Sequence, residues 1–238
     1  MRLAYAQAMS SPTLTLPAFD PRTVPVVADG ALSPLPPAPA GRLTPQGLRE
    51  LFAAPPVWTP ELAHEPRFLD RSPAEASVLL PLVMRDELKL LLTQRTPHLS
   101  THSGQIAFPG GKRDETDPDA VAAALREAEE EIGLPRSHVE VLGHMPTYVT
   151  GSAFIITPVV ALVQPDFDLR PNPDEVADVF EVPLSFLMDP RHHRRHAMAI
   201  NGQRREWYSM PYDDAGRERF IWGATAGMLR NFYRLLSA

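Results

Sequence analysis

The sequence predicts one domain of the α/β (α+β) class, a sandwich of strands and helices. Two observations support this prediction. Short apolar runs with strand character dominate the chain, and the few helical patterns do not alternate strictly with them. The 238 residues are 44% hydrophobic, which is enough to bury one sizeable core.

Composition excludes several classes of protein. The formal net charge is -6 and no basic stripe covers the chain, which disfavours nucleic-acid binding. The chain has no cysteine, so disulfides, thiolate metal sites and a cysteine nucleophile are excluded. No apolar run approaches the ~20 residues that cross a bilayer, and no sustained apolar stretch follows Arg2 as in a secretory signal. We therefore expect a cytoplasmic protein without membrane partners.

Proline divides the chain into two parts. Twelve of the 27 prolines fall within the first 60 residues, and the stretch Leu32–Gly41 is unsuited to a helix or an inner strand. We expect residues 1–42 to form a poorly ordered tail or a loosely attached arm. Residues 43–238 then form the domain.

The elements of the domain are predicted in chain order. Thr44 is placed to cap a short helix through Phe52. The best helix prediction is Asp119–Ile132, and a closing amphipathic helix is predicted over Glu218–Leu236. Pro81 favours an edge position for its strand. The predicted strands are Ser77–Arg85, Glu87–Arg95, Val139–Met145, Phe154–Val163, Val176–Leu184 and Arg205–Tyr208.

The helix over Asp119–Ile132 is crowded with glutamates on one side. At roughly 100° per residue its apolar stripe faces the core, and Glu127, Glu130 and Glu131 share a different face. Glu129 points away from these three, and Arg126 precedes Glu130 by four residues and is placed to pair with it. The apolar stripe consists of Val121, Leu125, Ala128 and Ile132.

Two interpretations of this acidic face are open. It is a solvated surface, as in most glutamate-rich helices, or it is a cation site. A glycine turn precedes the helix and lets backbone approach a ligand closely. Mg²⁺ or Mn²⁺ would relieve the repulsion, because both prefer oxygen ligands and often bridge to phosphates.

The motif Arg126–Leu134, REAEEEIGL, resembles the Nudix box, G-x5-E-x7-R-E-U-x-E-E-x-G-U, in which U is apolar. The end of the box matches at every fixed position. Its front differs, because Gly111 lies fifteen residues before Arg126 and Pro118 stands where the first Glu is expected. Three residues are candidates to replace that Glu: Asp114, Glu115 and Asp117.

A second block, Leu91–Gly111, resembles the signature of the coenzyme A pyrophosphatase branch of the Nudix hydrolases, LL-[TS]-x-R-[SA]-x3-R-x3-G-x3-FPGG. Thr96 replaces the small residue and Ser100 replaces the second Arg. Both resemblances together imply a Nudix-type α/β/α sandwich with a mixed sheet. The matching residues are Leu91, Leu92, Thr93, Arg95, Gly104, Phe108, Pro109, Gly110 and Gly111.

The resemblance implies an enzyme that hydrolyses the pyrophosphate bond of coenzyme A or its derivatives, giving 3′,5′-ADP and 4′-phosphopantetheine or its acyl form. It implies Mg²⁺ or Mn²⁺ as cofactor, with Glu127, Glu131, Glu130 and Gly111 as candidate metal ligands. A Glu or Asp within residues 172–178 is a further candidate ligand or base. The candidate catalytic residues are Glu130 and Arg126, and the candidate substrate-binding residues are Arg95, Gln105, Gly110 and Lys112.

Two other functions are weighed against this one. The first is hydrolysis of ADP-ribose or another nucleoside diphosphate derivative, and the second is a catalytically silent, nucleotide-binding Nudix module. The basic cluster Asp189–His196 is either a solvated loop or a contact for the 3′-phosphate of coenzyme A. A small-molecule partner is expected in each case, and the oligomeric state is left open, with a homodimer as one option.

Overall fold

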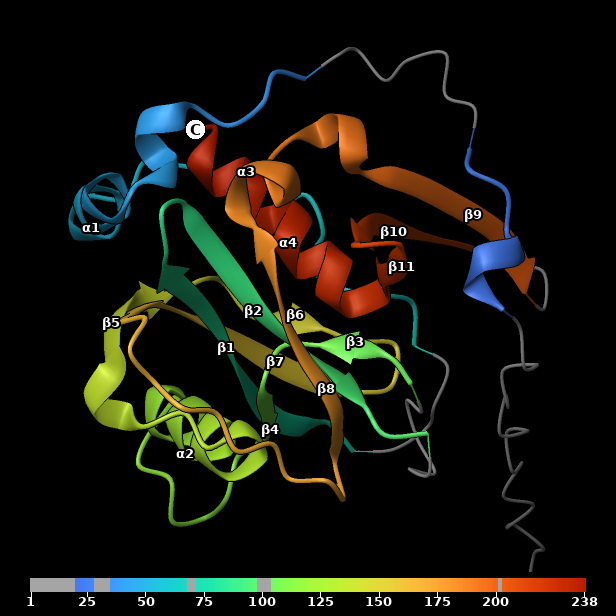
Figure 1. Ribbon diagram of the computed structural model, residues 1–238. Coiled ribbons are helices and arrows are strands. Elements are labelled where there is room, and N and C mark those ends of the chain that lie inside the picture. Colours follow the sequence, from blue (N-terminus) through green and yellow to red (C-terminus); the bar gives the residue numbers. More distant parts are fainter. Residues whose placement is uncertain (1–19, 28–34, 68–71, 98–103, 201–202) are drawn as a thin grey trace, which may run out of the picture.

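The computed structural model describes residues 20–27, 35–67, 72–97, 104–200 and 203–238 (Figure 1). A large mixed sheet has helix α2 (Ala120–Ile132) against one face and helix α4 (Gly223–Leu236) against the other. A smaller antiparallel sheet lies beside α4. Within the described ranges, none of the helices combines the length and apolar character that crossing a bilayer requires. The helices are α1 (Pro45–Ala53), α2 (Ala120–Ile132), α3 (Leu184–Leu187) and α4 (Gly223–Leu236), with 3-10 turns η1 (Pro21–Thr23), η2 (Ala40–Leu43), η3 (Arg136–His138) and η4 (Pro190–His192).

The main sheet has the strand order β3-β2-β1-β7-β5, with β4 also paired to β1, β6 to β7 and β8 to β2. The β1–β7 pair is parallel and the others are antiparallel, which confirms a mixed sheet. The strands are β1 (Ala74–Met84), β2 (Leu88–Arg95), β3 (Ile106–Ala107), β4 (Gly110–Lys112), β5 (Val139–His144), β6 (Tyr148–Val149), β7 (Phe154–Val163) and β8 (Val176–Pro183).

Alternating side chains of the sheet build a core on each face. Leu79 and Leu91 pack with Ala128 and Ile132 of α2. Their neighbours in sequence point to the other face and pack with α4. Both faces are therefore buried, which explains why these strands are almost continuously apolar.

We expected Pro81 to mark an edge strand. This expectation is wrong, because β1 lies in the middle of the sheet. Residues 76–78 of β1 pair with β4 and residues 82–84 pair with β2. Pro81 lies between these two pairings, where its missing N–H interrupts neither ladder.

The C-terminal part differs from the prediction. Residues 218–222 were expected to be helical, but Arg217–Trp222 is strand β11, and α4 begins only at Gly223, which has φ 64°. The short strand expected over 205–208 is part of a longer strand, β10 (Gln203–Asp214). The basic cluster is not a loop, because it contributes η4 and the start of β9 (Arg194–Ile200). Together β9, β10 and β11 form the smaller sheet.

The domain boundary expected at residue 42 stays a prediction, and residues 1–19 and 28–34 lie outside the described residues. The described segments before residue 42 contact the domain. The Val27 N–H donates to the Arg195 carbonyl at 2.8 Å, and the Ala38 N–H donates to the Met188 carbonyl at 3.0 Å. The Tyr233 hydroxyl donates to the Pro36 carbonyl at 2.7 Å.

We predict that deleting residues 1–40 lowers the free energy of unfolding by about 2–4 kcal/mol, because several hydrogen bonds are lost and buried groups such as the Tyr233 hydroxyl lose their partners. Urea unfolding measures the effect. A truncation that removes only residues 1–19 is the control, because it keeps both described segments. Equal unfolding free energies for the two truncations would contradict the prediction.

Candidate active site

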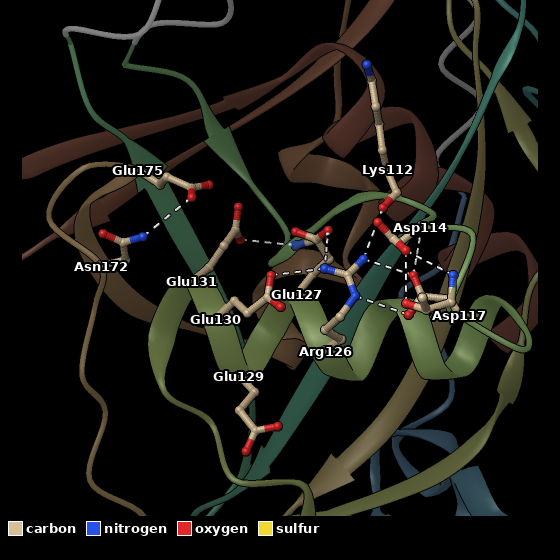
Figure 2. Close-up of polar contacts among 12 residues, drawn as sticks. Lys112, Asp114, Asp117, Arg126, Glu127, Glu129, Glu130, Glu131, Asn172 and Glu175 are labelled. Carbon is tan, nitrogen blue, oxygen red and sulfur yellow. Dashed lines mark hydrogen bonds and ion pairs between the residues drawn. The ribbon is translucent and has the colours of Figure 1, made fainter.

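Helix α2 is fixed at both ends and along one face. The Asp119 carboxylate caps its start by accepting from the Ala122 N–H at 2.8 Å. Gly133 ends it in the left-handed region at φ 69°. With Ala128 and Ile132 packed against the sheet, Glu127 and Glu131 are directed toward the turn around Gly110 and Gly111 (Figure 2).

Glu131 is the most enclosed of the four glutamates, with 4% of the residue exposed. Its Oε2 accepts from the Gly110 N–H at 3.1 Å, and its Oε1 lies 3.7 Å from Arg95 Nη1. The pKa of Glu131 is raised to about 7. Burial is the largest cause, the Gly110 N–H and Arg95 oppose it, and repulsion from Glu175 and Glu127 adds to it. Burial and the neighbouring carboxylates therefore disfavour the charged form of Glu131 in this site.

Gly110 is required for this contact. Its φ is 153°, and an added Cβ would lie 2.4 Å from the Ser77 carbonyl oxygen. A larger residue would displace the turn from β1, and with it the N–H that Glu131 accepts from.

Glu127 lies directly against the neighbouring glycine. A Cβ on Gly111 would be 2.4 Å from Glu127 Oε2, so a larger residue there would push the carboxylate out of its present position. Glu127 Oε1 lies 2.9 Å from Arg126 Nη1. Burial raises the pKa of Glu127, Arg126 opposes this effect, and Glu130 and Glu175 add to it by repulsion.

Arg126 joins the helix to the loop before it. Its Nε and Nη2 donate to the two oxygens of Asp117 at 3.1 and 2.9 Å, a bidentate pair. Its Nη1 donates to Glu130 Oε2 at 2.9 Å, and Nη2 also reaches the Lys112 carbonyl at 3.2 Å. The hydrogen bonds to Asp117 and Glu127 raise the pKa of Arg126, so its positive charge is secure.

Of the three residues that could replace the first box glutamate, Asp117 is the one that pairs with Arg126. Asp117 is buried and pairs with Arg126, whereas Asp114 accepts from Thr116 and Glu115 is exposed. Arg126 and the Asp114 N–H together lower the pKa of Asp117. In the box pattern the first glutamate lies six residues after the glycine. Six residues after Gly111 is Asp117, so the one residue that this chain has in excess of the pattern lies between Asp117 and Arg126. Counting back from Arg126 leads to Pro118 instead.

Glu175 completes the acidic group from outside the helix. Its loop is held by the Asn172 N–H, which donates to the Glu131 carbonyl at 2.8 Å, and by the Thr96 N–H, which donates to the Glu175 carbonyl at 3.0 Å. Figure 2 shows the Glu175 side chain beside that of Glu131. The sequence predicted an acidic residue from this loop as a ligand or base. Glu175 lies beside Glu131, whereas Asp178 pairs with Arg217 and Arg219.

The remaining candidates occupy more peripheral positions. Glu129 points away from the acidic group, as predicted, and its carboxylate pairs with Arg136 at 3.1 Å (Figure 2). The side chain of Glu130 is 59% exposed. The Lys112 side chain extends away from the carboxylates, and Gln105 is joined to Arg95 through its carbonyl, which accepts the Arg95 N–H at 2.9 Å. His98, Ser100 and His102 lie outside the described residues.

The donor set fits a hard divalent cation by its chemistry. Glu127, Glu131 and Glu175 supply carboxylate oxygens, and their mutual repulsion is what such an ion relieves. Among the described residues no three acidic or histidine side chains stand in coordinating geometry. Arg126 Nη1 contacts Oε1 of Glu127 and Oε2 of Glu130, which leaves the second oxygen of each carboxylate outside this contact.

We predict that Glu131→Gln stabilises the metal-free protein at high pH. A folded-state pKa raised from 4.5 to about 7 favours the protonated carboxyl, so this contribution to stability is full at low pH and is lost as the pH rises through 7. At about pH 8 the variant should gain up to about 3 kcal/mol over the parent, and at about pH 5 much less. Urea unfolding in EDTA measures this, with Glu129→Gln on the exposed face as the control. An equal gain at about pH 8 in both variants would contradict the prediction.

Comparisons with known proteins identify the family of the chain. The NUDIX domain family matches residues 73–201. The Nudix hydrolase NudL of Escherichia coli K12, named as uncharacterized, is 45% identical over 157 residues, which cover 66% of this chain and 79% of that protein. NudL of Shigella boydii serotype 18 matches with the same identity and coverage.

Solved structures match less completely. A Caenorhabditis elegans Ap4A hydrolase binary complex has a TM-score of 0.40 at 20% identity, covering 46% of this chain and 80% of that one. A NUDIX hydrolase from Nitrosomonas europaea has a TM-score of 0.39 at 20% identity, covering 48% and 58%. Assignment to a family therefore rests on the sequence matches, and by these the chain belongs to the Nudix hydrolase family.

Proposed function

We propose that this protein is a cytoplasmic, metal-dependent pyrophosphohydrolase of coenzyme A or its derivatives, which gives 3′,5′-ADP and 4′-phosphopantetheine or its acyl form. The observation that supports the reaction is the group of buried and half-buried carboxylates facing the Gly110–Gly111 turn, with Arg95 beside Glu131. The observation that supports the substrate is the resemblance of Leu91–Gly111 to the coenzyme A pyrophosphatase signature.

Glu127, Glu131 and Glu175 would hold Mg²⁺ or Mn²⁺, with the Gly111 carbonyl and Glu130 as further candidate ligands. Such an ion neutralises pyrophosphate charge and lowers the pKa of a bound water. Without a cation, the carboxylates would repel a pyrophosphate anion as they repel one another.

Glu130 is our candidate for the general base that takes the proton of the attacking water. Its side chain is largely exposed, so water can reach it, and Arg126 fixes one of its oxygens at 2.9 Å. Arg126 would act by holding Glu130 and Glu127 in place. Glu175 is the alternative base, because it lies outside the helix and beside Glu131.

Arg95 is our candidate for binding the substrate phosphates. Its Nε is buried and has no hydrogen-bond partner in the part of the chain that the structure describes. A buried donor without a partner is costly, and a phosphate oxygen would satisfy it. Gly110, Lys112 and Gln105 lie on the adjoining β2–β4 region and stay candidates for further substrate contacts.

An assay of the purified protein against several substrates tests the proposal. We expect Mg²⁺- or Mn²⁺-dependent turnover of coenzyme A and acetyl-coenzyme A, with 3′,5′-ADP identified by mass, and lower kcat/KM for dephospho-coenzyme A, ADP-ribose and NADH. A preference for ADP-ribose would replace the substrate but keep the reaction. Nucleotide binding without turnover would favour a silent binding module.

We predict that Glu127→Gln and Glu131→Gln each lower kcat by about 10²-fold or more, because each removes a ligand charge that supports metal-assisted hydrolysis. Glu129→Gln is the matched control on the same helix and should change kcat by less than about threefold, because its side chain points away. Comparable activity of Glu127→Gln and Glu129→Gln, with the same apparent metal affinity, would refute the assignment.

A further inference from the structure

The loop that carries Glu175 is suspended between two separate elements. At one side the Asn172 N–H donates to the Glu131 carbonyl at 2.8 Å and the Arg170 N–H to the Ile132 carbonyl at 2.8 Å, which ties the loop to the end of α2. At the other side it reaches the end of β2 at Thr96. The Glu175 position is therefore determined by how these two attachments hold the loop.

Thr96 holds two successive carbonyls of this loop. Its N–H donates to the Glu175 carbonyl at 3.0 Å, and its hydroxyl donates to the Asp174 carbonyl at 3.2 Å. Only 5% of Thr96 is exposed, so water competes little for these bonds. Two donors on one residue fix the direction of the loop as well as its distance from β2.

The regular sheet ladder does not supply this support. Pairing between β2 and β8 ends with Arg95 opposite Val176, and the register is already irregular between Gln94 and Arg95. Glu175 lies just before β8 begins. Beyond the ladder, the N–H and the hydroxyl of Thr96 together continue the attachment of the loop to β2.

Electrostatics makes such an attachment necessary. Glu175 repels both Glu131 and Glu127, as its effect on both carboxyls indicates. An unrestrained loop would carry the Glu175 carboxylate out to solvent, where the repulsion is weaker. Asn172 contributes on the same loop, because its Oδ1 accepts from the Asp174 N–H at 3.1 Å and its Nδ2 donates to Glu175 Oε1 at 3.4 Å.

We propose that Thr96 is a positioning residue, whose hydroxyl holds the Asn172–Val176 loop so that Glu175 completes the acidic site on α2. This rests on the proposed function, because it assigns Glu175 a part in the same site. Thr96 touches neither the substrate nor the ion, and it acts through Glu175. The hydroxyl is the part of the side chain that matters, so serine should replace threonine and valine should not.

Three variants test the proposal. Thr96→Val removes the hydroxyl and keeps the shape, and Thr96→Ser keeps the hydroxyl. Thr93→Val is the matched control on the same strand, because Thr93 is also buried and its hydroxyl donates to the Ala107 carbonyl at 3.2 Å. All three should fold, with Thr93→Val and Thr96→Val losing comparable stability in thermal unfolding.

Mn²⁺ binding without substrate, followed by electron paramagnetic resonance, is the first measurement. We expect Thr96→Val to weaken Mn²⁺ binding about fivefold, the effect of losing about one hydrogen bond, and Thr96→Ser and Thr93→Val to stay within about twofold of the parent. With coenzyme A, Thr96→Val should lower kcat about fivefold or more and change KM by less than about twofold.

A second background separates positioning from general destabilisation. In Glu175→Gln protein, adding Thr96→Val should cause no further loss of Mn²⁺ binding or of kcat, because the group through which Thr96 acts is already altered. The same loss in both backgrounds, or unchanged Mn²⁺ binding in Thr96→Val, would overturn the proposal. A parent that binds Mn²⁺ with this coupling yet hydrolyses no pyrophosphate would instead refute the proposed function alone.

Discussion

Arg126 contacts three carboxylates with a single guanidinium, and this arrangement organises the front of the site. Asp117 takes two of its donors in a bidentate pair, and Glu127 and Glu130 share a third. Bidentate pairing fixes the plane of the guanidinium, so the helix carboxylates meet it in one orientation. Among the described residues the carboxylates still outnumber the cations beside them, because Glu131 and Glu175 add two carboxylates to the three at Arg126, and Arg95 and Arg113 add two cations. The excess of negative charge is the physical argument for a cation at this site.

The two glycines of the turn connect this charge distribution to the fold. β4 pairs with β1, the strand between β2 and β7, so the turn is attached to the middle of the sheet. Gly110 leaves room for the Ser77 carbonyl on one side, and Gly111 leaves room for the Glu127 carboxylate on the other. Since α2 packs on the same sheet through Ala128 and Ile132, the distance between helix and turn is set by the core. Well-packed apolar contacts thus keep Glu127 and Glu131 close to the turn despite the repulsion between their carboxylates.

Local patterns predicted most of the main sheet and the direction of each glutamate on α2. The periodicity of α2 is long and uninterrupted, so Glu129 could be separated from Glu127 and Glu131 by sequence alone. The smaller sheet was missed because its signals are not local. Residues 218–222 fit an amphipathic helix, and they form a strand because β10 pairs along their length. Glu175 could not be chosen from its neighbours either, because its place depends on contacts to Thr96 and Glu131, distant in sequence.

Asp117 shows why a motif can vary in spacing and keep its contact. Aspartate is one methylene shorter than glutamate, and the chain has one more residue before Arg126 than the box pattern gives. The turn Asp114–Asp117 closes with a hydrogen bond of 3.1 Å between its end residues and directs the shorter carboxylate inward. Arg113 supports that turn because its Nη2 donates to the Asp117 and Pro118 carbonyls. Its Nη1 donates to the carboxylate of Glu75 in β1. At the front of the box the structure thus supplies a carboxylate that pairs with Arg126, although the spacing differs from the box pattern by one residue.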